Sequence, residues 1–236
     1  MRAVIVTGTS SGLGKAFFDL LADEAGYFIA IARRFLPEQI TRSIEEKDRI
    51  ILVESDLREL STLPTVEDLS KLLADPSIDE LVFINNAAVV GPIGAIGELP
   101  EEQLIEHIQV NTTAAQLLTN RLFSLPQLSR MKITVLNISS GAAVRLKGGW
   151  ALYCAAKAGN EMFFNVLADQ FKDNPNVQVV NVNPGIMDTQ MQENIRSASD
   201  VHFPDYQRFV AFKEEGKLAT PESVALTIVN QYVRGE

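Results

Sequence analysis

The sequence has little cysteine, a shortage of positive charge and no long apolar run. Cys154 is the single cysteine among 236 residues, so an intrachain disulfide is excluded and a reducing, cytoplasmic compartment is favoured. The net charge of −9 disfavours nucleic acids and anionic membranes as partners. No apolar stretch approaches the length that spans a bilayer, and we expect no signal peptide because a strand-like run begins at Arg2.

Strand and helix patterns alternate along the chain. Hydrophobic residues make up 46% and charged residues 22%, close to globular averages, so we expect one folded domain over residues 1–236. Short apolar runs predict strands over residues 2–7, 27–32, 50–53, 81–84, 132–138 and 177–182, and helical spacing predicts helices over about 15–26, 66–74, 101–125 and 153–172, with a last helix after Thr220. This alternation predicts an α/β Rossmann fold, a doubly wound parallel sheet of six to seven strands with helices on both faces. Residues 190–216 are predicted to form an irregular helical lid.

A glycine-rich loop separates the first predicted strand from the first predicted helix. Its glycines are Gly8, Gly12 and Gly14, a wider spacing than the usual G-x-G-x-x-G. Glycine is needed where the backbone turns sharply and approaches a pyrophosphate at a helix N-terminus. An ordinary glycine turn that caps a helix is the alternative. The order strand, loop, helix favours dinucleotide binding.

Two arginines follow the second predicted strand. An NAD site has an acidic residue near this position to bind the ribose 2′-hydroxyl, whereas a positive charge suits the 2′-phosphate of NADP. Arg33 and Arg34 therefore favour NADP, although either arginine could be solvated surface charge.

Tyr153 and Lys157 are four residues apart in an alanine-rich run that favours a helix. Residues at this spacing share one helix face. A nearby ammonium favours the phenolate, so we expect Lys157 to lower the pKa of Tyr153. A shift from about 10 to neutral pH requires about 4 kcal/mol, more than one surface ion pair supplies. The alternative is a lysine whose aliphatic stem covers a half-buried ring.

Several polar or glycine residues lie just past the ends of predicted strands. These residues are Gly8, Arg33, Asp56, Asn86, Ser140 and Pro184. Ligands of parallel α/β sheets bind at the carboxyl ends of the strands. We therefore expect these residues to share one rim of the sheet.

Together these residues resemble the short-chain dehydrogenase/reductase family over nearly the whole chain. Three family motifs appear: T-G-x-x-x-G-x-G at residues 7–14, N-N-A-G at residues 85–88 with Ala88 in the last place, and P-G-x-x-x-T at residues 184–189. Asn111 matches the structural asparagine of the family. Ser140 matches the catalytic serine, because it lies thirteen residues before Tyr153.

Residues 147–159, 185–192 and 212–222 look like the sepiapterin reductase branch, and especially its bacterial benzil reductase relatives. Those enzymes reduce one carbonyl of a vicinal diketone or of a pterin side chain with NADPH. The resemblance implies that Tyr153 is the general acid and that Ser140 holds the carbonyl oxygen. It also implies that Lys157 binds the nicotinamide ribose, and that Asn111 holds a water that connects this lysine to solvent.

The resemblance and the strand ends together define the candidate site. The predicted NADP(H) contacts are Gly8, Ser10, Ser11, Gly12, Leu13, Gly14, Arg33, Arg34, Asp56, Leu57, Asn86, Ala87, Ala88, Tyr153, Lys157, Pro184, Gly185, Ile186 and Thr189. The predicted substrate contacts are Ser140, Val144, Trp150, Tyr153 and Met187, with Phe203, Tyr206 and Phe209 as candidate lid aromatics. For any one of these aromatics, packing of the lid against its own core is the favoured role. No metal site is predicted.

The favoured function is therefore an NADPH-dependent carbonyl reductase acting on a small-molecule ketone or vicinal diketone. One alternative is another dehydrogenase of the family, such as a 3-oxoacyl-carrier-protein reductase. A second is a non-catalytic NADPH sensor, although such proteins have usually lost the tyrosine or the lysine. The family commonly pairs through the helices that carry Asn111 and Tyr153, so a homodimer is expected, with a tetramer as a further option.

Overall fold

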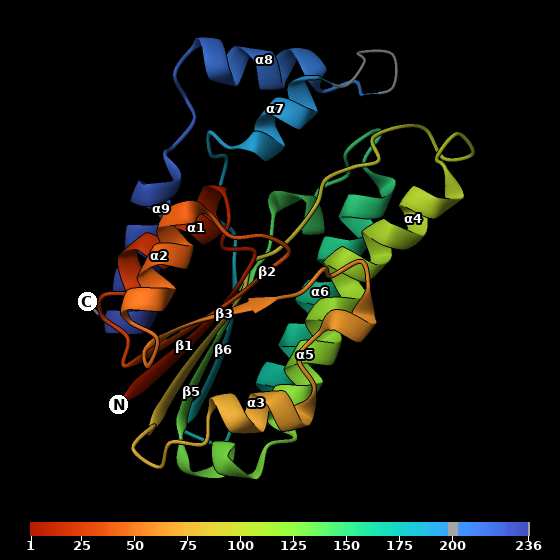
Figure 1. Cartoon of the computed structure of the whole chain (residues 1–236). Coiled ribbons are helices and arrows are strands. Elements are labelled where there is room, and N and C mark those ends of the chain that lie inside the picture. Colours follow the sequence, from red (N-terminus) through yellow and green to blue (C-terminus); the bar gives the residue numbers. More distant parts are fainter. Residues whose placement is uncertain (198–202, 236) are drawn as a thin grey trace.

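A six-stranded parallel sheet forms the centre of the molecule (Figure 1). The computed structural model describes residues 1–197 and 203–235. The strands are β1 (Arg2–Thr7), β2 (Tyr27–Ala32), β3 (Ile50–Glu54), β4 (Glu80–Asn85), β5 (Lys132–Ile138) and β6 (Val177–Val182), in the order β3-β2-β1-β4-β5-β6. The predicted fold class is thereby confirmed, with six strands in the part of the chain that the structure describes.

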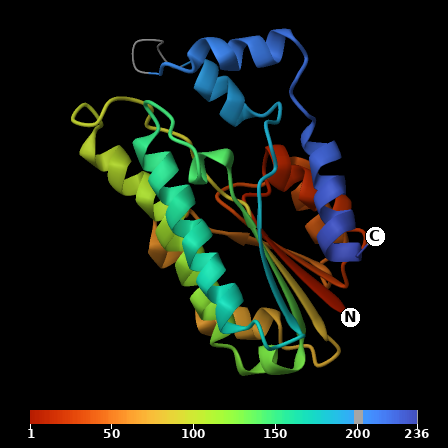
Figure 2. The ribbon, with the colours of Figure 1, turned by 180° about the vertical axis from the view of Figure 1, so that it is seen from behind.

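Helices cover both faces of the sheet, as Figures 1 and 2 show from opposite sides. One face carries α1 (Gly12–Leu21), α2 (Pro37–Glu45) and α9 (Pro221–Val229), and the other carries α3 (Val66–Leu72), α4 (Glu101–Ile108), α5 (Ala114–Phe123) and α6 (Ala151–Gln170). The helices α7 (Gln190–Arg196) and α8 (Tyr206–Glu214) lie beyond the carboxyl ends of the strands. None of the described helices combines the length and apolarity needed to cross a membrane.

The core lies on the two faces of the sheet because successive strand residues point to opposite sides. Val4 and Val6 of β1 pack in the cluster that contains Phe17 of α1. Ile5, between them, packs in the opposite cluster with Leu118 of α5. Since each fully buried side chain of this size contributes about 1.5–3 kcal/mol, the two clusters hold the strand ends rigidly where the site is built.

Two helical features differ from the sequence-based expectation. Helix α2 was not predicted because it is short and mostly polar, with Ile40 and Ile44 as its two apolar residues at helical spacing. Both isoleucines are exposed, and Gln39 is the one buried residue of the helix. The helix predicted over residues 101–125 is divided by a π-turn at Gln109–Thr113. A π-turn inserts one residue into the turn, which side-chain spacing does not reveal.

The lid and the last helix follow the expected pattern. Helices α7 and α8 lie within residues 190–216, while residues 198–202 of that segment are outside the described part of the chain. Thr220 caps α9 by accepting a hydrogen bond from the Ser223 amide at 3.2 Å, and Pro221 occupies the first helical position.

Candidate functional site

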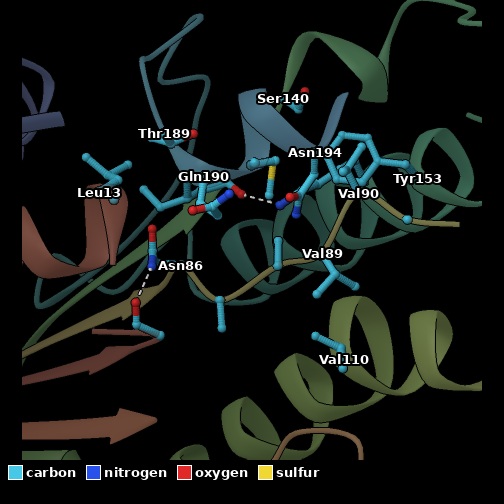
Figure 3. A pocket seen from close by; sticks show the side chains of 18 of the residues that line it. Leu13, Asn86, Val89, Val90, Val110, Ser140, Tyr153, Thr189, Gln190 and Asn194 are labelled. Atoms are coloured by element: carbon cyan, nitrogen blue, oxygen red, sulfur yellow. Dashed lines mark hydrogen bonds between the residues drawn. The ribbon is translucent and has the colours of Figure 1, made fainter. Parts of the chain in front are cut away.

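A cavity of about 1010 Å³ lies at the carboxyl ends of the strands (Figure 3). All the residues predicted to share this rim line it, as do all the predicted cofactor contacts. Figure 3 shows Leu13, Asn86 and Thr189 on one side, with Val90 and Tyr153 on the other. The cavity therefore runs from the glycine loop to the catalytic tyrosine predicted from the sequence.

The glycine loop is shaped by positions where a side chain does not fit. Gly8 and Gly12 have φ of +74° and +51°, in the left-handed region that favours glycine. A Cβ on Gly14 would lie 2.0 Å from the Gly8 carbonyl oxygen and 2.6 Å from Asn86 Nδ2. Asn86 Nδ2 also donates to the Thr7 carbonyl at 2.9 Å, so this asparagine fastens the loop to the end of β4.

The loop and the start of α1 fit a dinucleotide pyrophosphate. Ser11 is the N-cap of α1, but its side chain makes no capping hydrogen bond, and the first turn has no acidic residue. The N-terminal amides of this ten-residue helix are thus available to an anion. Arg33 and Arg34 are exposed and line the same cavity. The residues present are therefore those that a phosphorylated nucleotide requires.

Tyr153 and Lys157 lie on the buried face of α6. Burial raises the pKa of Tyr153 to about 12, and the nearby Ser140 hydroxyl counteracts this only in part. Burial lowers the pKa of Lys157 to about 8. Lys157 Nζ lies 5.8 Å from the centre of the tyrosine ring and donates to the Ile138 carbonyl at 2.7 Å.

The prediction that Lys157 lowers the pKa of Tyr153 is wrong for the protein without a bound cofactor. The ammonium is itself buried and directed at a backbone carbonyl, and it does not contribute to the shift of the phenol. Helix spacing predicts that two side chains share a face, but it does not reveal how deeply the sheet buries them. Here desolvation exceeds the attraction between charges.

Asn111 does not line the cavity. Its Oδ1 accepts from the Val89 amide at 2.9 Å, and its Nδ2 donates to the Val89 carbonyl at 2.8 Å. Its carbonyl, in the π-turn, accepts a hydrogen bond from Asn160 Nδ2. The side chain thus fastens the loop after β4 to the π-turn. The carbonyl of Asn111 also has a side-chain partner, and the water expected from the resemblance stays a prediction.

His107 is a site residue that the sequence reasoning missed. Its ring is buried, lies 6.3 Å from the Tyr153 ring in an edge-to-face arrangement and lines the cavity. Nδ1 lies 2.6 Å from the Gly91 carbonyl, and Nε2 lies 2.8 Å from Asn111 Nδ2. These partners require Nδ1 to donate and Nε2 to accept, so the ring is neutral, and burial lowers the pKa of His107 accordingly. The spacing of four residues to Asn111 is the signal that could have identified it.

A row of amide side chains joins β4, β5 and β6, with Asn85 and Asn137 buried and Asn181 half-buried. Asn85 Nδ2 donates to Asn137 Oδ1 at 2.8 Å, and Asn137 Nδ2 donates to Asn181 Oδ1 at 2.7 Å. The three asparagines are direct neighbours in the sheet register. They fix the ends of the strands that lead into Ser140 and Pro184.

At the substrate end of the cavity, the predicted contact with Val144 is wrong. This side chain is 75% exposed and is not among the residues that line the cavity, whereas Trp150 and Met187 do line it, as does Ser140. A short turn after β5 directs Val144 outward. Phe203 stacks on Trp150 with ring centres 5.1 Å apart.

The other candidate lid aromatics pack in the same cluster, which joins the lid to Trp150 at the start of α6. Phe209 is buried and lies 5.4 Å from both Trp150 and Phe203 between ring centres. Tyr206 is half-buried against the same cluster. The packing interpretation therefore holds for these aromatics, although Phe209 also lines the cavity.

Comparison with known proteins identifies relatives along almost the whole chain. Residues 2–200 match the family model described as short chain dehydrogenase. A benzil reductase ((S)-benzoin forming) of Bacillus cereus is 36% identical over 233 residues, which cover 98% of this chain and 93% of the relative. The sepiapterin reductase of Mus musculus is 31% identical over 212 residues, 83% of this chain and 78% of the relative.

A solved structure supports the same assignment at the level of the fold. A short-chain dehydrogenase/reductase from Saccharomyces cerevisiae superposes with a TM-score of 0.83 at 24% identity, covering 99% of this chain and 91% of that chain. The family match, the relatives and the glycine-loop geometry agree. The chain belongs to the short-chain dehydrogenase/reductase family of oxidoreductases, whose members bind nicotinamide cofactors.

Proposed function

We propose that this protein is an NADPH-dependent carbonyl reductase that transfers hydride to a ketone or vicinal diketone, with Tyr153 as the proton donor. The observation that carries the proposal is that Tyr153 lines the same cavity as the glycine loop, so proton donor and nucleotide site share one space. Burial raises the pKa of Tyr153 to about 12, so the phenol keeps its proton at neutral pH, as an unshifted tyrosine also does, and has a proton to donate.

The chemistry divides between the cofactor and the chain. The nicotinamide of a bound dinucleotide supplies the hydride. As the carbonyl carbon is reduced, negative charge develops on its oxygen, and the Tyr153 hydroxyl transfers a proton to that oxygen. The Ser140 hydroxyl lines the same cavity as Tyr153 and is available to stabilise the same charge. Lys157, buried beside the ring, is proposed to bind the cofactor ribose.

The charge at the far end of the cavity supports NADPH over NADH. Arg33 and Arg34 follow β2 without an acidic residue, and neither forms an ion pair with another described residue. Asp56, the nearby carboxylate, is paired with Arg58 at 2.6 Å, which lowers the pKa of Asp56. The two arginines are thus free for a 2′-phosphate.

The substrate class is supported by the named relatives and by the cavity wall. The Bacillus relative is a benzil reductase, and Val90, Met187 and Phe209 give the wall near Tyr153 an apolar surface suited to aryl or alkyl groups. A small-molecule substrate in a cytoplasmic enzyme is the corresponding expectation.

The test is NADPH oxidation with benzil, 1-phenyl-1,2-propanedione, sepiapterin and an acyl thioester, repeated with NADH. We expect turnover of the diketones, at least tenfold higher kcat/KM with NADPH than with NADH, and chiral hydroxyketone products. A tenfold preference corresponds to about 1.4 kcal/mol of differential binding. Turnover restricted to the acyl thioester would favour an acyl-carrier reductase. Tight NADPH binding without turnover would favour a sensor.

We also propose a homodimer formed through α6 and α4. Ala155, Gly159, Met162 and Val166 make an exposed apolar stripe along α6, with Met162 64% and Val166 59% exposed. A Cβ on Gly159 would have no atom within 4 Å, so a second helix can approach closely there. Ile105 on the neighbouring α4 extends the patch. Contiguous exposed apolar surface of this kind marks association sites.

Replacing Met162 with glutamate is expected to convert the dimer to a monomer, because a carboxylate would be buried without a partner at the interface. Light scattering coupled to size exclusion measures the mass. Ile44→Glu is the matched control, since Ile44 is 70% exposed on α2 and outside the stripe. A wild-type mass equal to one chain would contradict the proposal.

A further inference from the structure

Gln39 joins two segments of the cofactor cavity through one buried side chain. It is 0% exposed, although the rest of α2 is not buried. Its Nε2 donates to the Thr9 carbonyl in the glycine loop at 2.8 Å, across 30 residues of sequence. Its Oε1 accepts from the Leu36 amide at 3.0 Å. A buried amide is thus satisfied at both ends by backbone groups of different loops.

Helix capping explains one of these bonds. A residue at the third helical position commonly accepts a hydrogen bond from the N-cap amide, as Gln39 does from Leu36. Capping needs the oxygen alone, and glutamate would supply it equally well. The bond from Nε2 to Thr9 adds nothing to the helix, so it has a separate consequence in the glycine loop.

That consequence is the orientation of the peptide between Thr9 and Ser10. In a trans peptide the carbonyl and the following N–H point in opposite directions. Because the Thr9 carbonyl is directed at Gln39, the Ser10 N–H points away from α2. Ser10 lines the cavity, as does Ser11. Gln39 therefore sets how the backbone of the loop faces the ligand.

The bond to Leu36 fixes the second segment. Residues 33–36 leave the end of β2, which the sheet holds, and their far end is held by Gln39. Arg33 and Arg34 lie in this segment and line the cavity. The backbone that carries Arg33 and Arg34 is thus joined to the backbone of Thr9 through a single side chain.

We propose that Gln39 is a positioning residue for the 2′-phosphate subsite, which consists of Arg33, Arg34 and the Ser10 backbone. The inference rests on the proposed use of NADPH. It names the residue that holds the backbone of the phosphate-binding groups in their relative positions. Preorganised groups bind more tightly because no ordering cost arises on binding. The side-chain hydrogen bonds of Gln39 reach Leu36 and Thr9 and no residue of α1, so we expect the N-terminal amides of α1, at the pyrophosphate end, to change less than the Ser10 peptide.

The test compares two nucleotides that differ at the 2′ position. Adenosine 2′,5′-bisphosphate and adenosine 5′-monophosphate are titrated by calorimetry into the wild type and the Gln39→Met variant, which fills a similar volume without hydrogen bonds. We expect the bisphosphate to bind about tenfold more weakly to the variant, and the monophosphate to change less than about twofold. Ile40→Ala, at an exposed position of the same helix, should change neither value.

Gln39→Glu provides the second variant. A protonated carboxyl can both donate to Thr9 and accept from Leu36, whereas the ionised form cannot donate. The measured quantity is the ratio of the affinities for the bisphosphate and the monophosphate, divided by the same ratio for the wild type at each pH. In Gln39→Glu this relative preference should recover at acid pH and fall at alkaline pH. If Gln39→Met weakened the binding of both nucleotides equally, Gln39 would have a merely structural role and the inference would be overturned. A wild type that does not prefer the 2′-phosphate would overturn the NADPH proposal as well, and the variants are therefore interpreted only against that measurement.

Discussion

Replacing Tyr153 with phenylalanine is expected to lower kcat at least ~10²-fold, the lower range for loss of a general acid. The substitution removes the hydroxyl that is proposed to donate the proton and that lines the cavity together with Ser140. It retains the ring, which contacts Trp150 and His107 edge-to-face at 5.4 and 6.3 Å between ring centres. The fold and the nucleotide end of the cavity should therefore be unaffected, so KM for NADPH and the melting temperature should stay near their wild-type values.

Steady-state NADPH oxidation with the best diketone measures this effect. Cys154→Ser is the control, because Cys154 is adjacent in sequence but does not line the cavity, and its Sγ makes only a weak contact with the Arg145 carbonyl at 3.7 Å. The control should keep full turnover. Wild-type kcat in Tyr153→Phe would refute the role proposed for the phenol, and loss of NADPH binding in that variant would point to misfolding instead.

The parts of the site that the sequence predicted are those set by the main chain. Parallel strands have their carboxyl ends at one edge, so identifying where β1, β4 and β5 end was sufficient to place Gly8, Asn86 and Ser140 around one cavity. The glycine loop could also be predicted from the sequence, because the need for glycine there is steric. A Cβ on Gly14 does not fit beside the Gly8 carbonyl, and glycine is the residue that lacks one.

The parts that sequence reasoning missed depend on contacts between distant polar side chains. His107, Gln39 and Asn160 are each buried against a backbone carbonyl, and for Gln39 and Asn160 that carbonyl belongs to another element. Nothing in the neighbouring residues identifies that partner. The prediction that Val144 contacts the substrate was wrong for a related reason, since the turn after β5 decides which way its side chain points. Burial also determined the sign of the Tyr153 pKa shift, which helix spacing alone did not predict.

The burial of Lys157 predicts an unusual dependence of stability on pH. The pKa of Lys157 is about 8 in the folded state and about 10.5 in the unfolded state. Between these values the unfolded chain binds more protons than the folded chain, so the free energy of unfolding rises with pH. Below pH 8 both states are charged and the full cost of the buried ammonium remains. From pH 8 to 9.5 the expected gain is about 2 kcal/mol.

Tyr153 sets the upper limit of the pH range in which the effect of Lys157 on stability can be measured alone. Its pKa is raised to about 12 when folded, so above pH 10 the unfolded chain loses a proton that the folded chain keeps, and stability falls again. Urea unfolding at intervals between pH 7.5 and 9.5 therefore isolates the lysine. In Lys157→Met the rise should disappear, whatever the absolute stability of the variant, because methionine does not titrate. A wild type whose stability stays flat over this window, or a Lys157→Met variant that keeps the rise, would show that the ammonium is not held in the dry environment beside Ile138 and Tyr153. The same environment surrounds Tyr153, so the burial that raises the pKa of the phenol would then be contradicted as well.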